Sequence, residues 1–396
     1  MKHCKKVILL WIVMMVGLTL SCRSSPASEQ IPKNPKELNV LSSHNTSEDS
    51  EKLEVTLLGI YLTARKNDDS FVSNKSVKAR FIDVISVYPV IKALVNNKEI
   101  YFCKFDSVCI NGKVLPVDKI KQWDSKKYGK IEFFWYEIVP DKFSYQNKLS
   151  TGRIDKIEYK ELLSFSSEDW EQTLIGELGT RRFKLEARYN SKKISTPGKE
   201  SANKENLLPK VFRVSVREDR GEGDNVDYMT YFFNLPYIWG NTLNQVEHFI
   251  GVDCQDLVWF GLKEAGVVPE AQYDHHIHDV YRKKMVFDGY VMMDGKTIGK
   301  DSTNVNVSIK RGDVVRLANF GHYGAIYKDC SKQSKKGNTK GESGKPNGKL
   351  DGSDLVIHIL FYKPRIERLS TLIWRYNDNH IQIFQFHIKT RKMRER

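Results

Sequence analysis

The chain has 396 residues, of which 28% are charged, 40% are hydrophobic and 11% are aromatic. This is the composition of a globular protein, and it excludes a wholly disordered, a collagen-like and a multi-span membrane protein. Lysine and arginine outnumber aspartate and glutamate by 63 to 49, a formal net charge of +14 that favours anionic partners without specifying one. Because no recognition helix, zinc-finger spacing or basic groove with interleaved aromatics is present, we expect no nucleic-acid partner.

Residues 1–21 have the pattern of a signal peptide. A basic start precedes a nearly continuous apolar run from Val7 to Leu20, shorter than the roughly 20 residues that span a membrane. The run ends in Leu18-Thr19-Leu20-Ser21-Cys22, which resembles a loosely written bacterial lipobox with Cys22 as the lipidated residue. Ordinary secretion with cleavage nearby is the alternative. Both predict export, and the first predicts a protein of the cell envelope, lipid-anchored to a bacterial membrane and facing the periplasm or the exterior.

Residues 22–51 are predicted to be a flexible tether, because Ser, Asn, Pro and Glu dominate them and few apolar side chains could drive folding. From residue 52 to 225 the apolar residues form short alternating or continuous runs, such as Phe133-Phe134-Trp135-Tyr136, between turn residues. This pattern predicts a mainly β accessory domain, with the polar stretch Ser191 to Asn206 as a long surface loop. No catalytic cluster stands out in this domain, so we expect it to position the second domain or narrow its cleft.

Two of the cysteines lie close together in the predicted β domain. Cys103 and Cys109 flank an expected turn between two short apolar runs. In an oxidising compartment they could form one disulfide across a hairpin, and two free, half-buried thiols are the alternative.

The pattern changes after residue 225, and residues 226–396 are predicted to form an α+β domain. Cys254 to Ala265 carries apolar residues on one helical face, and Gly266 follows where a helix would end. The predicted strands that follow are Val314 to Leu317, Tyr323 to Tyr327, Leu355 to Phe361 and His380 to Ile388.

Three residues of this domain have the order and context of a catalytic triad. Cys254 stands at the predicted helix start, where the helix dipole lowers the pKa of a thiol, and Asp253 is a good N-cap. His322 is a candidate base on a strand, on one face with Gly324, and His358 on the next strand would orient its imidazole. Strand parity permits this arrangement if both imidazoles point to the helix that carries Cys254. Alone, each residue would more often be an ordinary core residue.

The pattern around these residues resembles the NlpC-type cell-wall cysteine peptidases, a bacterial branch of the papain-like superfamily. It begins with Pro236-Tyr237-Ile238-Trp239-Gly240 and continues with Val252-Asp253-Cys254 at a helix start. A strand entry at Gly312-Asp313-Val314, the strand from Gly321 to Tyr327 and the final His358 complete it. The resemblance covers about residues 230–365.

The resemblance implies a papain-like fold and a role for five residues. Cys254 would be the nucleophile, His322 the general base and His358 the orienting group. Tyr237 would shape the substrate pocket, and Asp253 would receive a free amine of the peptide or serve only as the helix cap. The implied activity is hydrolysis of peptidoglycan stem peptides, at the bond between D-glutamate and the following diamino acid, with no metal or cofactor.

The sequence departs from the family pattern at Gln255-Asp256, where Ser-Gly is usual. Since Asp256 adds negative charge near a thiolate, a catalytically inactive module that binds wall fragments or an envelope protein is an alternative. An amidase or acyltransferase of the same fold is another. The run Asp274-His275-His276-Ile277-His278 clusters metal-ligand types without a complete set, so we predict no metal site. The lysine-rich insert Ser331 to Leu350 is expected to be a solvated loop, the alternative being a basic lid.

Overall fold

The computed structural model describes the greater part of the chain after residue 52. The described residues are 53–67, 72–145, 154–174, 177–204, 207–220, 224–268, 278, 282–292, 295–330, 346–361 and 363–386. The predicted signal peptide, Cys22 and the tether lie outside them. The contacts divide the chain into two units, Met1–Glu51 and Lys52–Arg396, so the division between residues 225 and 226 stays a prediction. The protein is mixed α+β, with 18% helix and 45% strand.

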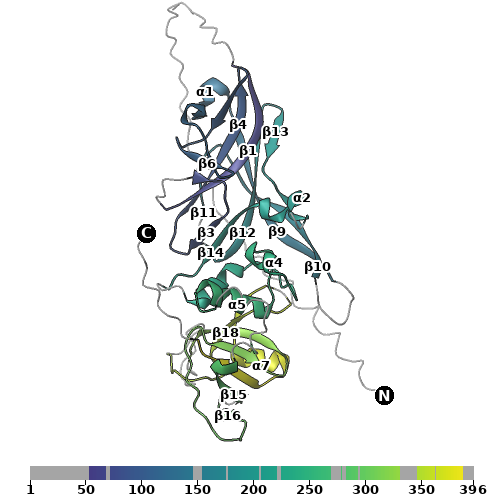
Figure 1. Ribbon diagram of the computed structural model, residues 1–396. Coiled ribbons are helices and arrows are strands. Elements are labelled where there is room, and N and C mark those ends of the chain that lie inside the picture. Colours follow the sequence, from purple (N-terminus) through teal and green to yellow (C-terminus); the bar gives the residue numbers. More distant parts are fainter. Residues whose placement is uncertain are drawn as a thin grey trace, which may run out of the picture. The chain divides into compact units, whose positions relative to one another are not determined.

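The predicted mainly β region forms two sheets (Figure 1). The first contains β1 (Val55–Lys66), β2 (Val72–Ser73), β4 (Ile85–Val95), β5 (Lys98–Phe102), β6 (Val108–Ile110), β7 (Lys113–Val114), β8 (Ile120–Lys121) and β11 (Gln172–Leu174). The second contains β3 (Val77–Arg80), β9 (Glu132–Tyr145), β10 (Ile154–Ser167), β12 (Gly179–Tyr189), β13 (Lys192–Ser195) and β14 (Phe212–Arg217). Their orders are β7-β6-β2-β1-β4-β5-β8, with β11 on β4, and β10-β9-β12-β14-β3, with β13 on β12.

The two sheets share one apolar core. Ile91 and Phe102 from the first sheet and Trp135 and Leu185 from the second are fully buried in the same cluster. Burying a side chain of this size contributes about 1.5–3 kcal/mol to the stability of the fold. The short apolar runs of the sequence are thus the strand segments that face this core.

Two predictions in this region are wrong, both because of long-range topology. Cys103 and Cys109 are free thiols, since β6 pairs with β2 and β7, and three strands, β2, β1 and β4, separate it from β5. The Cys103 thiol instead donates to the carbonyl of Phe105 at 2.9 Å. The stretch Ser191 to Asn206 is also not a long loop, because it contains β13, which pairs with β12, and the short helix α2 (Lys199–Ala202).

The C-terminal part contains a seven-stranded sheet of order β16-β15-β21-β17-β18-β19-β20, antiparallel throughout. Its strands are β15 (Met285–Val291), β16 (Thr297–Gly299), β17 (Val314–Leu317), β18 (His322–Lys328), β19 (Leu355–His358), β20 (Arg365–Arg368) and β21 (His380–Phe384). The α-helices among the described residues are α1 (Ser125–Tyr128), α2, α3 (Asn225–Met229), α4 (Leu243–Glu247), α5 (Cys254–Glu264) and α7 (Leu369–Tyr376). The four predicted strands and the helix at Cys254 are therefore present, whereas β15, β16, β20 and α7 were not predicted.

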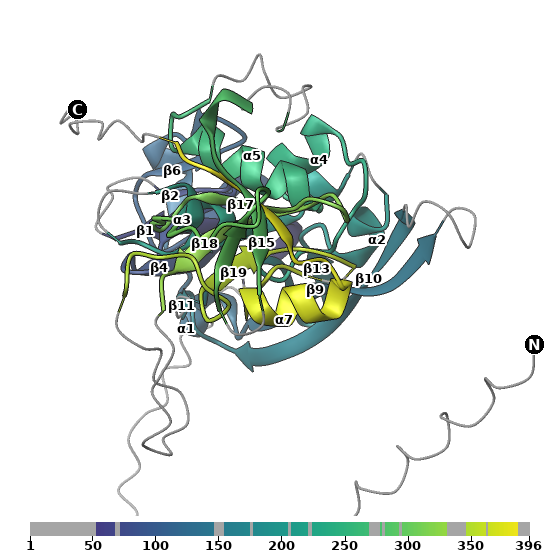
Figure 2. The same ribbon diagram turned by 90° about the horizontal axis from the view of Figure 1, so that it is seen from below.

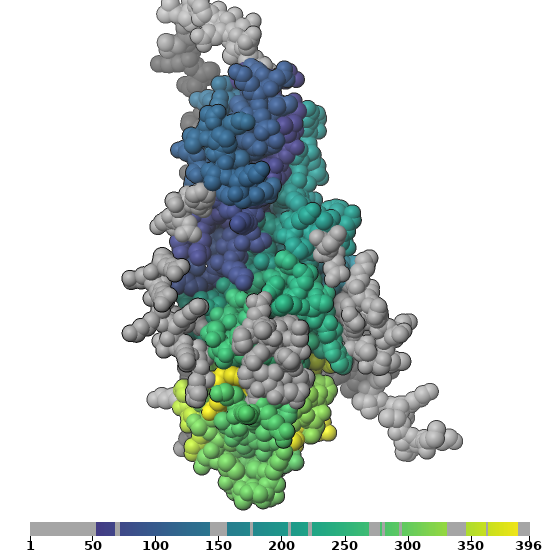
Figure 3. Space-filling view, viewed as in Figure 1, coloured from purple at the N-terminus to yellow at the C-terminus, as the bar shows by residue number. Residues whose placement is uncertain are grey.

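Helices cover both faces of this sheet, with α5 on one side and α7 on the other (Figure 2). Strand alternation separates the two cores. Tyr323 and Ala325 of β18 pack with Leu257 of α5, whereas Ile326 packs with Leu372 of α7. Figure 3 shows the surfaces of both regions, purple to teal up to β14 and green to yellow beyond. Among the described residues, no helix combines the length and the apolar character needed to cross a membrane.

Candidate active site

Cys254 is the first residue of α5, and Asp253 caps that helix as the sequence predicts. One carboxylate oxygen of Asp253 accepts from the N–H of Asp256 at 2.8 Å, and the other accepts from the N–H of Gly240 at 3.3 Å. The N–H of Asp253 in turn donates to the side chain of Asn241 at 2.8 Å. The carboxylate therefore fastens the helix start to the preceding turn. The capping role is observed, and binding of a substrate amine stays a prediction.

Tyr237 is brought beside the helix start by main-chain pairing. The segment 236–238 forms a parallel bridge with Val252, through hydrogen bonds of 3.1 and 3.2 Å. Tyr237 is buried, with its ring 5.9 Å from that of Phe361. Burial raises the pKa of its phenol, and negative charge on Cys254 would raise it further, so the group is a neutral hydrogen-bond donor next to the thiol.

The loop that leads into Cys254 is held by two arginines of the β region. Arg182 donates to the carbonyls of His248 and Phe249, and Arg213 donates to that of His248 at 2.7 Å. Burial lowers the pKa of Arg182, and burial with the charge of Arg182 lowers that of Arg213 to about 9. Phe249 has a φ of 54°, a left-handed conformation that a bulky residue adopts only when its surroundings hold it. The position of the nucleophile thus depends on the β region.

His322 and His358 lie side by side on adjacent strands. β18 and β19 pair in the register Gly324 to His358, and Nε2 of His322 lies 3.0 Å from Nδ1 of His358. Both side chains are buried. The contact continues to a residue that the sequence did not single out: Nε2 of His358 lies 3.2 Å from Oε2 of Glu367 on β20. Arg375 of α7 donates to both oxygens of that carboxylate, at 3.0 Å to Oε1. We call His322, His358 and Glu367 the histidine relay.

The relay lies on a different face of the sheet from the one expected. His322 and His358 share a face, as the triad requires, but alternation along β18 puts that face on the side of α7. The ring of Tyr376, the last residue of α7, lies 5.7 Å from that of His322. Sequence parity fixes which residues share a face, and it does not say which helix covers that face.

Cys254 contacts β18 through the backbone of the residue that follows His322. The β18–β19 ladder ends at the pair formed by Gly324 and His358, and the sulfur of Cys254 accepts a hydrogen bond from the N–H of Tyr323, the residue after His322. Nδ1 of His322 is buried and makes no hydrogen bond with any described residue. The sulfur therefore contacts the backbone of β18 next to His322, and no described hydrogen bond joins it to the imidazole. Catalytic hydrogen bonds are often loose before substrate binds.

The charges of the resting site differ from the expected thiolate. Burial raises the pKa of Cys254 to about 12, and the negative charges of Asp253 and Asp256 raise it further against the main-chain N–H donors. Burial lowers the pKa of His322 well below its usual value, and lowers that of His358 to about 3 with help from Arg365 and Arg375. Desolvation at this helix start outweighs the helix dipole. The resting pair is a neutral thiol beside a neutral imidazole.

The remaining predicted features do not join this site. Residues 274–277 of the histidine-rich run lie outside the described residues, and the ring of His278 packs 6.1 Å from that of Phe384. The described part of the chain holds no group of three or more His, Cys, Asp or Glu side chains that could bind a metal ion. Of the insert Ser331 to Leu350, residues 331–345 are not described.

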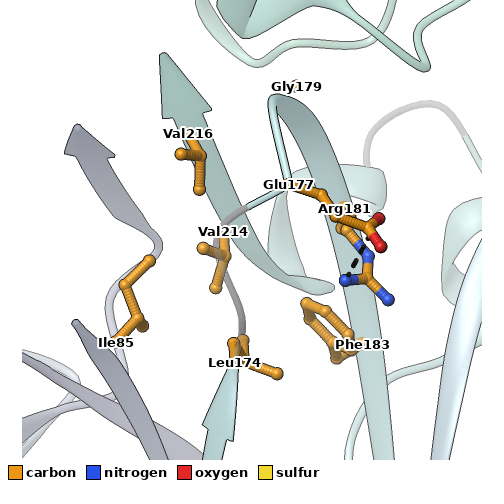
Figure 4. Close-up of a pocket in the computed structure, with 8 residues that line it drawn as sticks. All are labelled: Ile85, Leu174, Glu177, Gly179, Arg181, Phe183, Val214 and Val216. Atoms are coloured by element: carbon orange, nitrogen blue, oxygen red, sulfur yellow. Dashed lines mark ion pairs between the residues drawn. The ribbon is translucent and has the colours of Figure 1, made fainter. Parts of the chain in front are cut away.

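A pocket in the β region also lies apart from this chemistry (Figure 4). Its walls are mainly apolar and include Leu174, Phe183 and Val214. Its polar feature is an ion pair of 3.6 Å between Arg181 and Glu177, and it contains no nucleophile or base. Chemistry therefore points to the site around Cys254.

Comparison with known proteins identifies no relative. No family model matches the chain, and neither the curated proteins nor the solved structures contain a match.

Proposed function

We propose that the protein is an exported cysteine peptidase that hydrolyses peptide bonds in the stem peptides of bacterial peptidoglycan. The observation that carries the proposal is the histidine relay, which ends at an unbonded Nδ1 of His322. The N–H of the following residue, Tyr323, donates to the sulfur of Cys254. A buried polar atom without a hydrogen-bond partner lowers the stability of the fold by about 1–3 kcal/mol. A general base that accepts the proton of a nucleophile gives a functional reason for keeping such an atom.

The mechanism uses the neutral pair as it stands. Nδ1 of His322 takes the thiol proton as the sulfur of Cys254 attacks the peptide carbonyl, which forms the S–C bond and places negative charge on oxygen. The N–H of Cys254, at the start of α5, and the phenol of Tyr237 are the groups that would donate to that oxygen. His322 then protonates the leaving amine as the C–N bond breaks. Water, deprotonated by His322, hydrolyses the thioester and restores the thiol.

Two aromatic side chains beside Tyr237 support a binding surface for the substrate. Trp239, two residues after Tyr237, is 49% exposed, and Phe361, whose ring lies 5.9 Å from that of the buried Tyr237, is 50% exposed. Exposed rings next to a reactive group commonly supply apolar contact area for a ligand. In our proposal Cys22 anchors the protein to the membrane.

A second candidate is a catalytically inactive module of the same kind that binds wall fragments. The raised pKa of Cys254 and the neighbouring Asp253 and Asp256 favour it, because a neutral thiol is a weak nucleophile. A module that only binds has no need of a buried base without a partner. We therefore prefer the peptidase.

The test uses purified peptidoglycan and mass spectrometry of the released fragments. The full chain should release cleaved stem peptides, and Cys254→Ala should release none above background. Cys109→Ala, which removes another free thiol, is the matched control and should retain activity. Cleavage by Cys254→Ala would disprove the mechanism. Binding of wall fragments without cleavage by the unmodified chain would establish the second candidate, and the mass of any product identifies the bond.

A further inference from the structure

The end of the histidine relay determines where its protons lie. Glu367 receives both terminal N–H groups of Arg375, and the guanidinium of Arg365 lies 3.5 Å from it. A carboxylate held this way only accepts hydrogen bonds. The contact of 3.2 Å between its Oε2 and Nε2 of His358 therefore requires the proton of His358 to be on Nε2.

The same reasoning determines which nitrogen of His322 carries the proton. A neutral histidine with its proton on Nε2 offers a lone pair at Nδ1. Because Nδ1 of His358 then accepts, Nε2 of His322 must donate across their 3.0 Å contact. The proton of His322 is on Nε2, and its Nδ1 is left with a free lone pair. That is the atom that the structure leaves without a hydrogen bond.

We propose that Glu367 is a positioning residue that sets the tautomers of both histidines and so keeps Nδ1 of His322 available as a base. This inference rests on the proposed function only for its catalytic consequence, since the tautomers are properties of the free protein. Glu367 acts through His358 and touches neither Cys254 nor a substrate.

The sharpest variant is Glu367→Gln, which keeps the size of the side chain. Arg375 can donate only to the amide oxygen, so the amide NH2 turns toward Nε2 of His358 and donates to it. Each proton of the relay then moves to the other nitrogen. His322 becomes protonated on Nδ1 and loses its capacity to accept the thiol proton.

The matched control is Asp288→Asn. Asp288 lies on the same sheet and contacts another imidazole, with 2.6 Å between its Oδ1 and Nε2 of His380. Among the described contacts, no hydrogen bond or ion pair joins Asp288 or His380 directly to His322, His358 or Glu367. The substitution therefore makes the same chemical change, from a carboxylate to an amide, at another acid–imidazole contact. The proposal gives that contact no part in catalysis.

The experiment is long-range 1H–15N NMR of the full chain labelled with 15N-histidine, with signals assigned from His322→Gln and His358→Gln. We expect His322 and His358 to be protonated on Nε2 in the unmodified chain and on Nδ1 in Glu367→Gln. Asp288→Asn should leave both unchanged. Protonation of His322 on Nδ1 in the unmodified chain, or unchanged tautomers in Glu367→Gln, would overturn the proposal.

Kinetics separate this proposal from the proposed function. If stem peptides are cleaved, Glu367→Gln should lower kcat by roughly 10- to 100-fold, as for other lost outer-shell partners, with little change in KM. Glu367→Asp keeps an acceptor-only group and should restore the Nε2 tautomers. If no peptide is cleaved while the tautomers respond as described, the peptidase assignment fails and the role of Glu367 stands.

Discussion

Two acid–imidazole pairs lie on the same seven-stranded sheet. In one, His358 of β19 contacts Glu367 of β20, and in the other, His380 of β21 contacts Asp288 of β15. The second contact is shorter, at 2.6 Å against 3.2 Å. Distance alone would therefore select His380 as the better-oriented imidazole.

The pairs differ in burial and in what lies beyond the imidazole. His358 is fully buried, and its other nitrogen continues to His322 at the position of Cys254. The half-buried His380 stacks on Tyr290, and its other nitrogen meets the side chain of Asn319 at 3.4 Å. A carboxylate next to a histidine is thus no evidence of catalysis by itself. The relay is distinguished by a chain of buried contacts that ends at an unbonded atom.

The largest effect should come from removing the base at the end of this chain. His322→Ala should reduce peptide hydrolysis roughly 10⁴- to 10⁶-fold, since members of a catalytic triad act as a unit. His380→Ala is the matched control and should leave the rate nearly unchanged, because His380 contacts Asp288 and Asn319 and not the relay. Steady-state kinetics on wall peptides measures both. Equal losses of activity in the two variants would mean that the relay has no catalytic role that the Asp288–His380 pair lacks.

A smaller loss is expected at His358, because it orients the base without touching substrate. His358→Ala should lower kcat by roughly 10–1000-fold, by comparison with other lost orienting groups. His358→Gln keeps a hydrogen-bonding group next to Nε2 of His322 and should retain more activity. If both variants matched the unmodified chain in kcat, Cys254 and His322 would form a dyad and His358 would be an ordinary core residue.

Local pattern was sufficient to predict the helix that begins at Cys254 and the strands that carry His322 and His358. β17 has the predicted bounds, and α5 begins at Cys254 with Asp253 as its cap. Because β18 and β19 are apolar runs on neighbouring strands, the meeting of their two histidines also followed from the sequence.

Other features depend on contacts that no local pattern contains. Glu367 lies in the short, polar strand Arg365–Arg368, which gave no sign of a sheet position. The raised pKa of Cys254 results from burial that only the folded chain creates. The dependence of the Cys254 loop on Arg182 likewise joins residues far apart in the sequence. These interactions could not be predicted from the sequence, because each depends on packing between elements that are distant in the chain.

The last prediction concerns acid stability, and it follows from the burial of His358. Its pKa is lowered from 6.5 to about 3 in the folded protein, so between these values the unfolded chain binds more protons than the folded one. The free energy of unfolding therefore falls as the pH drops from 6.5 toward 3, by up to about 1.4 kcal/mol per pH unit for this one group. His358→Gln removes this titration, and its stability should fall less steeply with acid by up to that amount. Urea unfolding of the unmodified chain and of His358→Gln, between pH 3 and 6.5, measures the difference in their free energies of unfolding. The contributions of the other titrating groups largely cancel in this difference. Parallel stability curves would show that His358 titrates alike in both states, and that it is not buried as a neutral member of the relay.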